Sequence, residues 1–200
     1  MQGLHVSALR NLMRVIAGKF RSRPLRSLAG LDIRPTSDRL RETLFNVLTA
    51  GNPQALEGSV WIDLFAGTGA VGIEALSRGA AMVYFVESSR RAAELIKQNL
   101  GSLKIEGGFK ILQQDSVSAI KQLVGQGIRP NFVFLDPPYQ DHKAYGQTLA
   151  ALSGWALVAD ATVIAEHDKR FDPGENFARL PQGRKLEQGD AALSFYSLAR

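Results

Sequence analysis

From residue 59 onward, short apolar runs alternate with amphipathic stretches. The apolar runs have the length of strands and lie at 59–64, 81–86, 109–114, 131–135 and 161–166. Between them, apolar residues recur at helical spacing in 70–78, 89–100, 116–124 and 142–152. Such alternation is typical of a parallel sheet with helices on both faces. The sequence therefore predicts an α/β domain over 53–200, closed by an antiparallel hairpin around Gln188-Gly189-Asp190.

A different pattern precedes this alternation, in residues 13–52. The apolar residues Val15-Ile16 and 31–33 predict a short hairpin, and a helix should begin near Thr36 or Ser37, which are good helix caps. The helix has an apolar stripe at four-residue spacing, formed by Leu40, Leu44 and Leu48. Arg39 and Arg41 are read as lying off this stripe.

Composition narrows the class of protein. The chain has 200 residues, the size of one domain, and no cysteine, which excludes disulfides and thiolate metal sites. No apolar run reaches the ~18 residues of a membrane span. Residues 1–12 have no periodic apolar face, so we expect a poorly ordered leader rather than a secretory signal. His5, His142 and His167 lack ligand spacing, so no metal site is predicted. We expect a cytoplasmic monomer.

The positive charge is concentrated near the N-terminus. The whole chain has a net charge of +5, whereas Arg10 to Arg41 contains nine basic and two acidic residues. Eight of the nine are arginine, which can fork onto phosphates and stack on bases. Such a cluster is an electrostatic footprint for a polyanion, so residues 13–52 are predicted to face nucleic acid.

A glycine-rich turn follows the first strand of the α/β domain. Gly67 and Gly69 let the backbone turn sharply and approach a ligand. Glu87 follows the next strand, 20 residues after Gly67, where an acid would bind ribose hydroxyls. Asp63 would repel a pyrophosphate but suits the ammonium group of a methionine moiety, and Asp115 is placed for an adenine amine. These features favour an adenosine cofactor other than a dinucleotide.

The strand 131–135 runs directly into Asp136-Pro137-Pro138-Tyr139. The prolines hold this backbone stiff and keep its carbonyls out of a helix. Asp136 and a backbone carbonyl could accept two N–H bonds from a planar ring with an exocyclic amine, while Tyr139 covers the ring face. The segment therefore predicts a site for a conjugated amine.

Together these motifs resemble the class I S-adenosylmethionine-dependent methyltransferases. On the N-terminal side, Met13–Arg21 and Arg34–Asn46 are similar to the bacterial 16S rRNA guanine-N2 methyltransferase (RsmD) family, from about Met13 to the C-terminus. The resemblance implies a Rossmann-like, mostly parallel seven-stranded sheet with a small N-terminal extension. It also implies S-adenosylmethionine as methyl donor and a guanine of 16S rRNA, in an assembled or assembling small subunit, as target.

The resemblance assigns three groups of residues. The catalytic group is Asp136, Pro137, Pro138 and Tyr139. The cofactor group is Asp63, Phe65, Ala66, Gly67, Thr68, Gly69, Glu87, Asp115 and Ser116. The RNA-binding group is Arg14, Lys19, Arg21, Arg34, Thr36, Arg39 and Arg41. Three alternatives stay open: an adenine-N6 methyltransferase of DNA or RNA, a nicotinamide-dependent oxidoreductase, and a non-catalytic RNA-binding factor.

Overall fold

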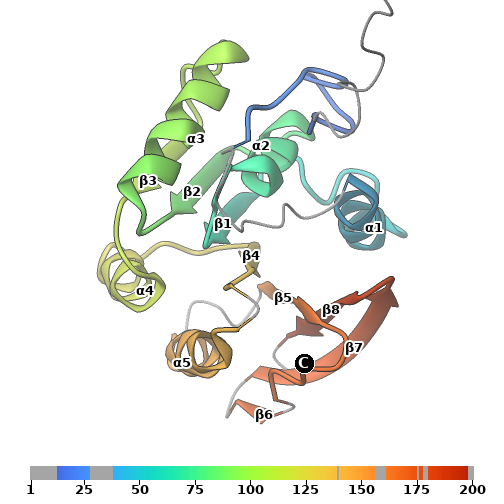
Figure 1. Ribbon diagram of the computed structural model, residues 1–200, viewed down its shortest axis with the longest axis vertical. Helices are drawn as coiled ribbons and strands as arrows, with labels where there is room; N and C mark the ends of the chain where they lie inside the picture. The colour runs from blue at the N-terminus through green and yellow to red at the C-terminus, as the bar shows by residue number, and fades with distance from the viewer. Residues whose placement is uncertain are drawn as a thin grey trace, which may run out of the picture.

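The protein folds into one mixed sheet flanked by helices (Figure 1). The computed structural model describes residues 13–27, 38–138, 140–155, 161–174, 176–177 and 180–197. The helices are α1 (Asp38–Thr49), α2 (Ala70–Ser77), α3 (Arg90–Ser102), α4 (Ser116–Gly125) and α5 (His142–Ser153). The strands are β1 (Val60–Leu64), β2 (Met82–Val86), β3 (Phe109–Leu112), β4 (Phe132–Leu135), β5 (Thr162–Asp168), β6 (Asn176–Phe177), β7 (Leu180–Gln188) and β8 (Ala191–Tyr196).

The α/β fold predicted from the alternating pattern is confirmed. Within the described residues the strand order is β3-β2-β1-β4-β5-β8-β7-β6, parallel from β3 to β5 and antiparallel beyond. The described residues form one strand more than the seven predicted. The additional strand, β6, has only two residues and pairs with Leu180 and Pro181. A two-residue strand is too short to leave a periodic signal in the sequence.

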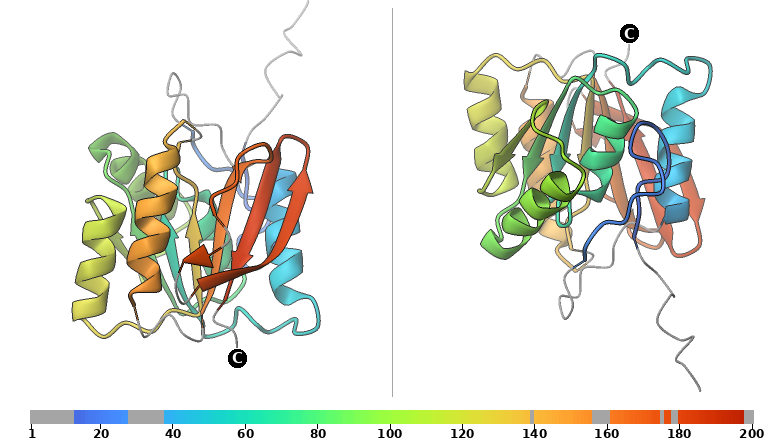
Figure 2. Two further views of the ribbon diagram at one scale, coloured as in Figure 1. Left: turned by 90° about the horizontal axis from the view of Figure 1, so that it is seen from below. Right: turned by 90° about the horizontal axis from the view of Figure 1, so that it is seen from above.

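Helices cover both faces of the sheet. α1, α2 and α3 lie on one face, and α4 and α5 lie on the other (Figures 1 and 2). On the first face, the buried Trp61 ring lies 5.3 Å from both Phe45 of α1 and Phe132 of β4. On the second face, Tyr145 and Leu149 of α5 are fully buried. None of the described helices is long and apolar enough to span a membrane.

The N-terminal segment forms its own small hairpin over residues 13–25. Arg14 bridges Pro24, and the Val15 N–H donates to the Arg23 carbonyl at 3.0 Å. This differs from the predicted pairing of Val15-Ile16 with 31–33, because the hairpin turn comes earlier. The expected strand at 31–33 and the expected disorder of residues 1–12 lie outside the described residues.

A buried carboxylate attaches this hairpin to α2. Glu74 is fully buried, and its two carboxylate oxygens accept the backbone N–H groups of Ile16 at 2.7 Å and Ala17 at 2.9 Å. Arg78 completes the arrangement through its Nε, 2.7 Å from the same carboxylate. A buried carboxylate needs such partners, since its desolvation is otherwise costly. Glu74 therefore fixes the basic segment against the α/β domain.

The strand register brings the candidate residues to one edge of the sheet. Leu64 lies opposite Val86 of β2 and Leu135 of β4, and Leu135 lies opposite Ala165 of β5. The residues that follow these strand positions therefore form a row at the carboxyl edge: Phe65, Glu87, Asp136 and Glu166. Ligands of open α/β sheets bind at this edge.

Candidate active site

The turn after β1 has a backbone conformation that most residue types rarely adopt. Phe65, Gly67 and Gly69 have φ values of 63°, 53° and 79°, in the left-handed region. Glycine adopts this region freely, whereas a phenylalanine there is strained, and such strain persists where the surrounding structure holds it. Gly69 is the N-cap of α2 and donates its N–H to the Ala66 carbonyl at 2.7 Å. The turn thus places the N-terminus of α2 at the carboxyl edge.

Glu87 holds this turn from the neighbouring strand. One carboxylate oxygen accepts the Gly67 N–H at 2.9 Å, and the other accepts the Ser89 N–H at 2.7 Å. A carboxylate has about four acceptor positions, so these two bonds leave two for hydroxyl donors of a ligand. The glycine turn and Glu87 are therefore in direct contact at the carboxyl edge of the sheet.

Asp63 is almost wholly buried, with 2% of its surface exposed. Its Oδ2 accepts the Gly72 N–H at 2.9 Å. Burial raises the pKa of Asp63 to about 7, the Glu87 carboxylate adds to this rise, and the hydrogen bond from Gly72 opposes it. A side chain at Gly72 would collide with Phe85, because its Cβ would lie 2.3 Å from a Phe85 ring carbon. The Asp63–Gly72 pair therefore joins β1 to α2, and a ligand cation would favour the ionised form of Asp63.

The Asp63 environment predicts a specific dependence of stability on pH. The folded-state pKa of about 7 lies above the ordinary 3.8, so folding favours the protonated carboxyl. The stabilising contribution is full below about pH 3.8 and is lost as the pH rises through 7. We expect Asp63→Asn, which keeps an acceptor for Gly72, to match the wild type near pH 4. At pH 8 it should be more stable by up to roughly 4 kcal/mol, at about 1.4 kcal/mol per pKa unit. Urea unfolding at both pH values checks this, and equal pH dependence in the two proteins would contradict it.

Asp115 and Ser116 begin α4 beyond β3. The exposed Asp115 caps the helix by accepting the Ser118 N–H at 2.9 Å, and this hydrogen bond lowers the pKa of Asp115. The Ser116 hydroxyl lies 2.9 Å from the Thr148 hydroxyl and is buried between α4 and α5. The Ser116 side chain therefore points away from the edge, and only its backbone and Asp115 remain available to a ligand there.

The loop after β4 is held at three points. Pro137 is buried, and its carbonyl oxygen lies 3.4 Å from the hydroxyl of buried Tyr145. The same hydroxyl donates to the Glu166 carbonyl at 2.7 Å, which ties the loop to β5. The Pro138 carbonyl accepts the Asp141 N–H at 2.7 Å, and Asp141 caps α5. Since a carbonyl oxygen has two lone pairs, the Tyr145 contact leaves one acceptor position on Pro137. Tyr139 lies outside the described residues.

Comparisons with known proteins show the family of this chain. The family model described as "Conserved hypothetical protein 95" matches residues 13–197. The "Ribosomal RNA small subunit methyltransferase D" of Haemophilus influenzae is 37% identical over 176 residues, covering 85% of this chain and 87% of that protein. The chain belongs to the RsmD family.

Two solved structures extend the comparison. The structure of yhhF from Escherichia coli has a TM-score of 0.77 at 30% identity and covers 94% of this chain and 99% of that one. SMU.776, complexed with SAH (S-adenosylhomocysteine), has a TM-score of 0.62 at 13% identity and covers 80% of this chain and 48% of that one. The latter likeness is one of fold alone. The methyltransferase architecture expected for an RsmD-family chain is thus confirmed.

The basic residues of this RsmD-family chain do not all lie on its surface. Arg41 of α1 has a fully buried side chain, and its Nη2 donates to the Arg14 carbonyl and to Asp38. Burial lowers the pKa of its guanidinium, and the neighbouring Asp38 opposes this. The prediction that Arg41 lies off the apolar stripe is wrong, and its buried side chain is not available at the surface for the RNA contact expected of it. Arg41 lies four residues before the buried Phe45 and is therefore on the apolar face of the helix, where it joins α1 to the N-terminal hairpin.

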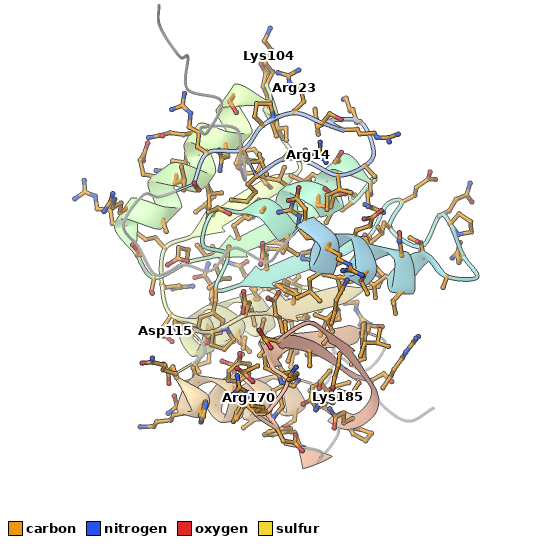
Figure 3. All side chains as sticks on the ribbon, turned by 45° about the vertical axis from the view of Figure 1, so that its right-hand side comes forward. Arg14, Arg23, Lys104, Asp115, Arg170 and Lys185 are labelled. Atoms are coloured by element: carbon orange, nitrogen blue, oxygen red, sulfur yellow. The ribbon has the colours of Figure 1, made fainter. Side chains whose placement is uncertain are left out.

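The other basic candidates fall into two groups. Four of them are exposed, and they are Arg14, Lys19, Arg21 and Arg39. Arg23, also exposed, donates to the Ser102 carbonyl at 3.3 Å, which brings the hairpin beside Lys104 at the end of α3 (Figure 3). Arg34 and Thr36 lie outside the described residues. The described part of the hairpin thus presents a basic surface that continues onto α3.

Three contacts around the site were not expected from the sequence. Asn99 is fully buried and donates to the Thr68 carbonyl at 2.9 Å, and its side chain also bonds both backbone groups of Arg26. Thr68 itself turns its hydroxyl toward the Met13 sulfur at 3.5 Å, so its side chain lies away from the edge. The third contact is that of the Tyr145 hydroxyl with the Pro137 carbonyl oxygen. The sequence does contain a signal for the Asn99 contacts. An asparagine on the apolar face of a predicted helix has to be buried, and a buried amide needs hydrogen-bond partners.

Proposed function

We propose that this protein transfers a methyl group from S-adenosylmethionine to the exocyclic N2 of a guanine in 16S rRNA. One observation carries the proposal. The glycine turn with Glu87 and the Asp136-Pro137-Pro138 loop follow adjacent strands whose ends are in register at one edge of the sheet. Family membership supports the same reading, since relatives in the family are named ribosomal RNA small subunit methyltransferase D.

The cofactor would lie across the ends of β1, β2 and β3. S-adenosylmethionine supplies an activated methyl group on its sulfonium, and the protein binds and orients it. Two acceptor positions of Glu87 would take the ribose hydroxyls, and Asp115 with the Ser116 backbone would hold the adenine. Phe65, Ala66, Gly67 and Gly69 would line the methionine and ribose. Buried Asp63 would balance the ammonium group, since its ionised form lacks a cation partner in the contacts of the described residues.

The target amine would meet the loop after β4. A guanine amine is a weak nucleophile, because its lone pair is delocalised into the ring. Asp136 and the remaining acceptor position of the Pro137 carbonyl would accept its two N–H bonds and localise that lone pair toward the methyl group. Correct orientation supplies much of the rate, worth ~7–11 kcal/mol in favourable cases. The proton on nitrogen becomes acidic after transfer and would pass to Asp136.

The target guanine has to leave its stack to reach this loop, which favours a loop or flipped nucleotide of the RNA. Mapping modified nucleosides of 16S rRNA in cells with and without the gene tests the proposal. We expect one N2-methylguanosine to be lost on deletion and restored by the wild-type gene. An unchanged nucleoside map would contradict the proposed reaction. We propose that the substrate is 16S rRNA within an assembled or assembling small ribosomal subunit. The enzyme is proposed to act as a monomer.

The exposed hairpin residues Lys19, Arg21 and Arg23 are expected to contact RNA phosphates. Replacing all three by alanine should weaken binding to 16S rRNA and reduce the slope of log affinity against log salt by up to ~0.7 per lost contact. A filter-binding series at several salt concentrations measures this slope. Replacing Lys169, which is paired with Asp190 at 3.4 Å, serves as a matched control. If the triple variant keeps the wild-type slope, the hairpin does not bind RNA.

The adenine-N6 alternative uses the same acceptors, because adenine also has a conjugated exocyclic amine. The methylated nucleoside distinguishes the two, as N6-methyladenosine would replace N2-methylguanosine. The nicotinamide-dependent alternative predicts binding of NAD instead of S-adenosylmethionine, which calorimetric titration separates. Asp63 disfavours it, because a buried carboxylate near the glycine turn repels a pyrophosphate.

A further inference from the structure

We propose that the exposed ring of His142 is a stacking site for a nucleobase that flanks the methylated guanine. This site rests on the proposed function and adds a substrate contact to it. The spacing of His142 from the other histidines fits no metal site, so the sequence assigns this residue no role. Its surroundings in the fold give the reason to assign one.

The His142 ring is held flat by a second aromatic ring. The residue is exposed at the start of α5, and its ring stacks on Phe171 with centroids 4.0 Å apart and planes 14° from parallel. Phe171 is partly buried and lies 5.0 Å from the ring of buried Tyr145. One face of the imidazole is therefore supported by packed rings, while the residue remains open to solvent. A planar ring fixed in this way can stack on any base.

The pair lies next to the catalytic loop. The hydrogen bond from the Asp141 N–H to the Pro138 carbonyl closes the loop directly before His142. Phe171 follows the end of β5, where its N–H donates to the Asp168 carbonyl at 2.9 Å. β5 is the neighbour of β4 on the side away from β1. His142 and Phe171 are thus at the carboxyl edge, beside Asp136 and opposite the cofactor half of the sheet.

The geometry of the reaction directs RNA to this side. The cofactor would occupy the ends of β1, β2 and β3, so the nucleotides that flank the target have the β4–β5 side of the edge open to them. Extruding a base leaves its neighbours partly unstacked. An aromatic ring beside the pocket restores the lost stacking, and this interaction is tolerant of base identity.

The cations near Phe171 do not by themselves account for an RNA contact beside His142. Arg170 is 78% exposed next to Phe171, but its Nε lies 3.4 Å from Asp168 (Figure 3). Lys169 and Lys185 are likewise paired, with Asp190 and Glu187. These three cations are each balanced by a carboxylate. Stacking on His142 would add a contact that does not depend on their charge.

Four variants test the site on small subunits purified from a strain that lacks the gene. His142→Ala should raise KM for the particle by roughly 5- to 100-fold, the equivalent of one base–aromatic stack. His142→Phe should restore a KM near that of the wild type, because it keeps the planar ring. His142→Leu should behave like His142→Ala, since it keeps apolar packing on Phe171 without a π face. Gln147→Ala, an exposed position farther along α5, should leave KM unchanged.

The outcomes separate stacking from a structural role. Affinity for S-adenosylmethionine and the melting temperature should be alike in the His142→Phe and wild-type proteins. Rescue of KM by His142→Leu, or a KM for His142→Ala equal to that of Gln147→Ala, would overturn the stacking site alone. If the wild-type protein fails to methylate the particle, the proposed function fails and the site fails with it.

Discussion

Asp136→Ala should nearly abolish methyl transfer while cofactor binding stays close to normal. The substitution removes the side-chain acceptor of the target amine, at the end of β4 and not in the glycine turn. We expect the single-turnover rate to fall by at least about 100-fold, as for loss of one contact made in the transition state. Asp136→Asn should lose less, because its amide oxygen still accepts one hydrogen bond.

A neighbouring carboxylate provides the control for this experiment. Asp141→Ala removes the cap of α5, whose side chain accepts the Ala144 N–H at 3.1 Å, and should cost about 0.5–2 kcal/mol of stability. Its transfer rate should stay within a few-fold of the wild type. A near-normal rate for Asp136→Ala, or equal losses in the two variants, would show that Asp136 has no specific role in the chemistry.

Glu87→Ala should have the second largest effect, on cofactor affinity. The change removes the acceptor of the Gly67 and Ser89 N–H groups and of the proposed ribose hydroxyls. Hydrogen bonds to a charged group are worth ~1.5–3 kcal/mol each, so we expect S-adenosylmethionine binding to weaken by 100-fold or more. RNA binding should barely change. Calorimetric titration measures both affinities.

Glu94→Ala is the matched control for Glu87. Glu94 is an exposed carboxylate on α3, and its partner is Lys97 at 3.3 Å. Exposed pairs of this kind contribute little, so cofactor affinity should be unchanged. If Glu87→Ala binds the cofactor as well as Glu94→Ala does, Glu87 is not part of the cofactor site.

Much of the α/β domain could be predicted from local patterns. The parallel strands are short apolar runs that end at polar residues. Consecutive residues are therefore enough to predict where each of these strands lies. The common edge follows from parallel topology, which puts Glu87 and Asp136 in one row. The glycine turn was predictable because the left-handed φ values at Gly67 and Gly69 suit glycine.

Contacts between distant segments were not predictable in this way. Glu74 binds backbone groups of residues 16 and 17, 57 or more positions away, and no local pattern records such pairing. The charge of Arg41 favours an exposed position, whereas its spacing to Phe45 favours the apolar face of α1, and the structure follows the spacing. A guanidinium can be buried where it holds backbone and carboxylate oxygens, as Nη2 of Arg41 does with Arg14 and Asp38.

Contacts between distant segments also shape the candidate site in the C-terminal half of the chain, and local patterns do not predict them. Tyr145 reads as an apolar position of α5, yet its hydroxyl joins the Pro137 and Glu166 carbonyls. His142 reads as an ordinary exposed residue, and only the turn after β5 brings Phe171 against it. In both residues the role depends on which strand lies beside β4, which is a property of topology.

The most direct test of the account is the chemical identity of the product. Purified protein would be mixed in a single turnover with S-adenosylmethionine carrying a labelled methyl group and small subunits from a strain lacking the gene. Digestion to nucleosides and mass spectrometry would follow. The account predicts the label in N2-methylguanosine of 16S rRNA and in no other nucleoside. Label in N6-methyladenosine would contradict the substrate assignment, and no transfer to RNA or particle would contradict the proposed function.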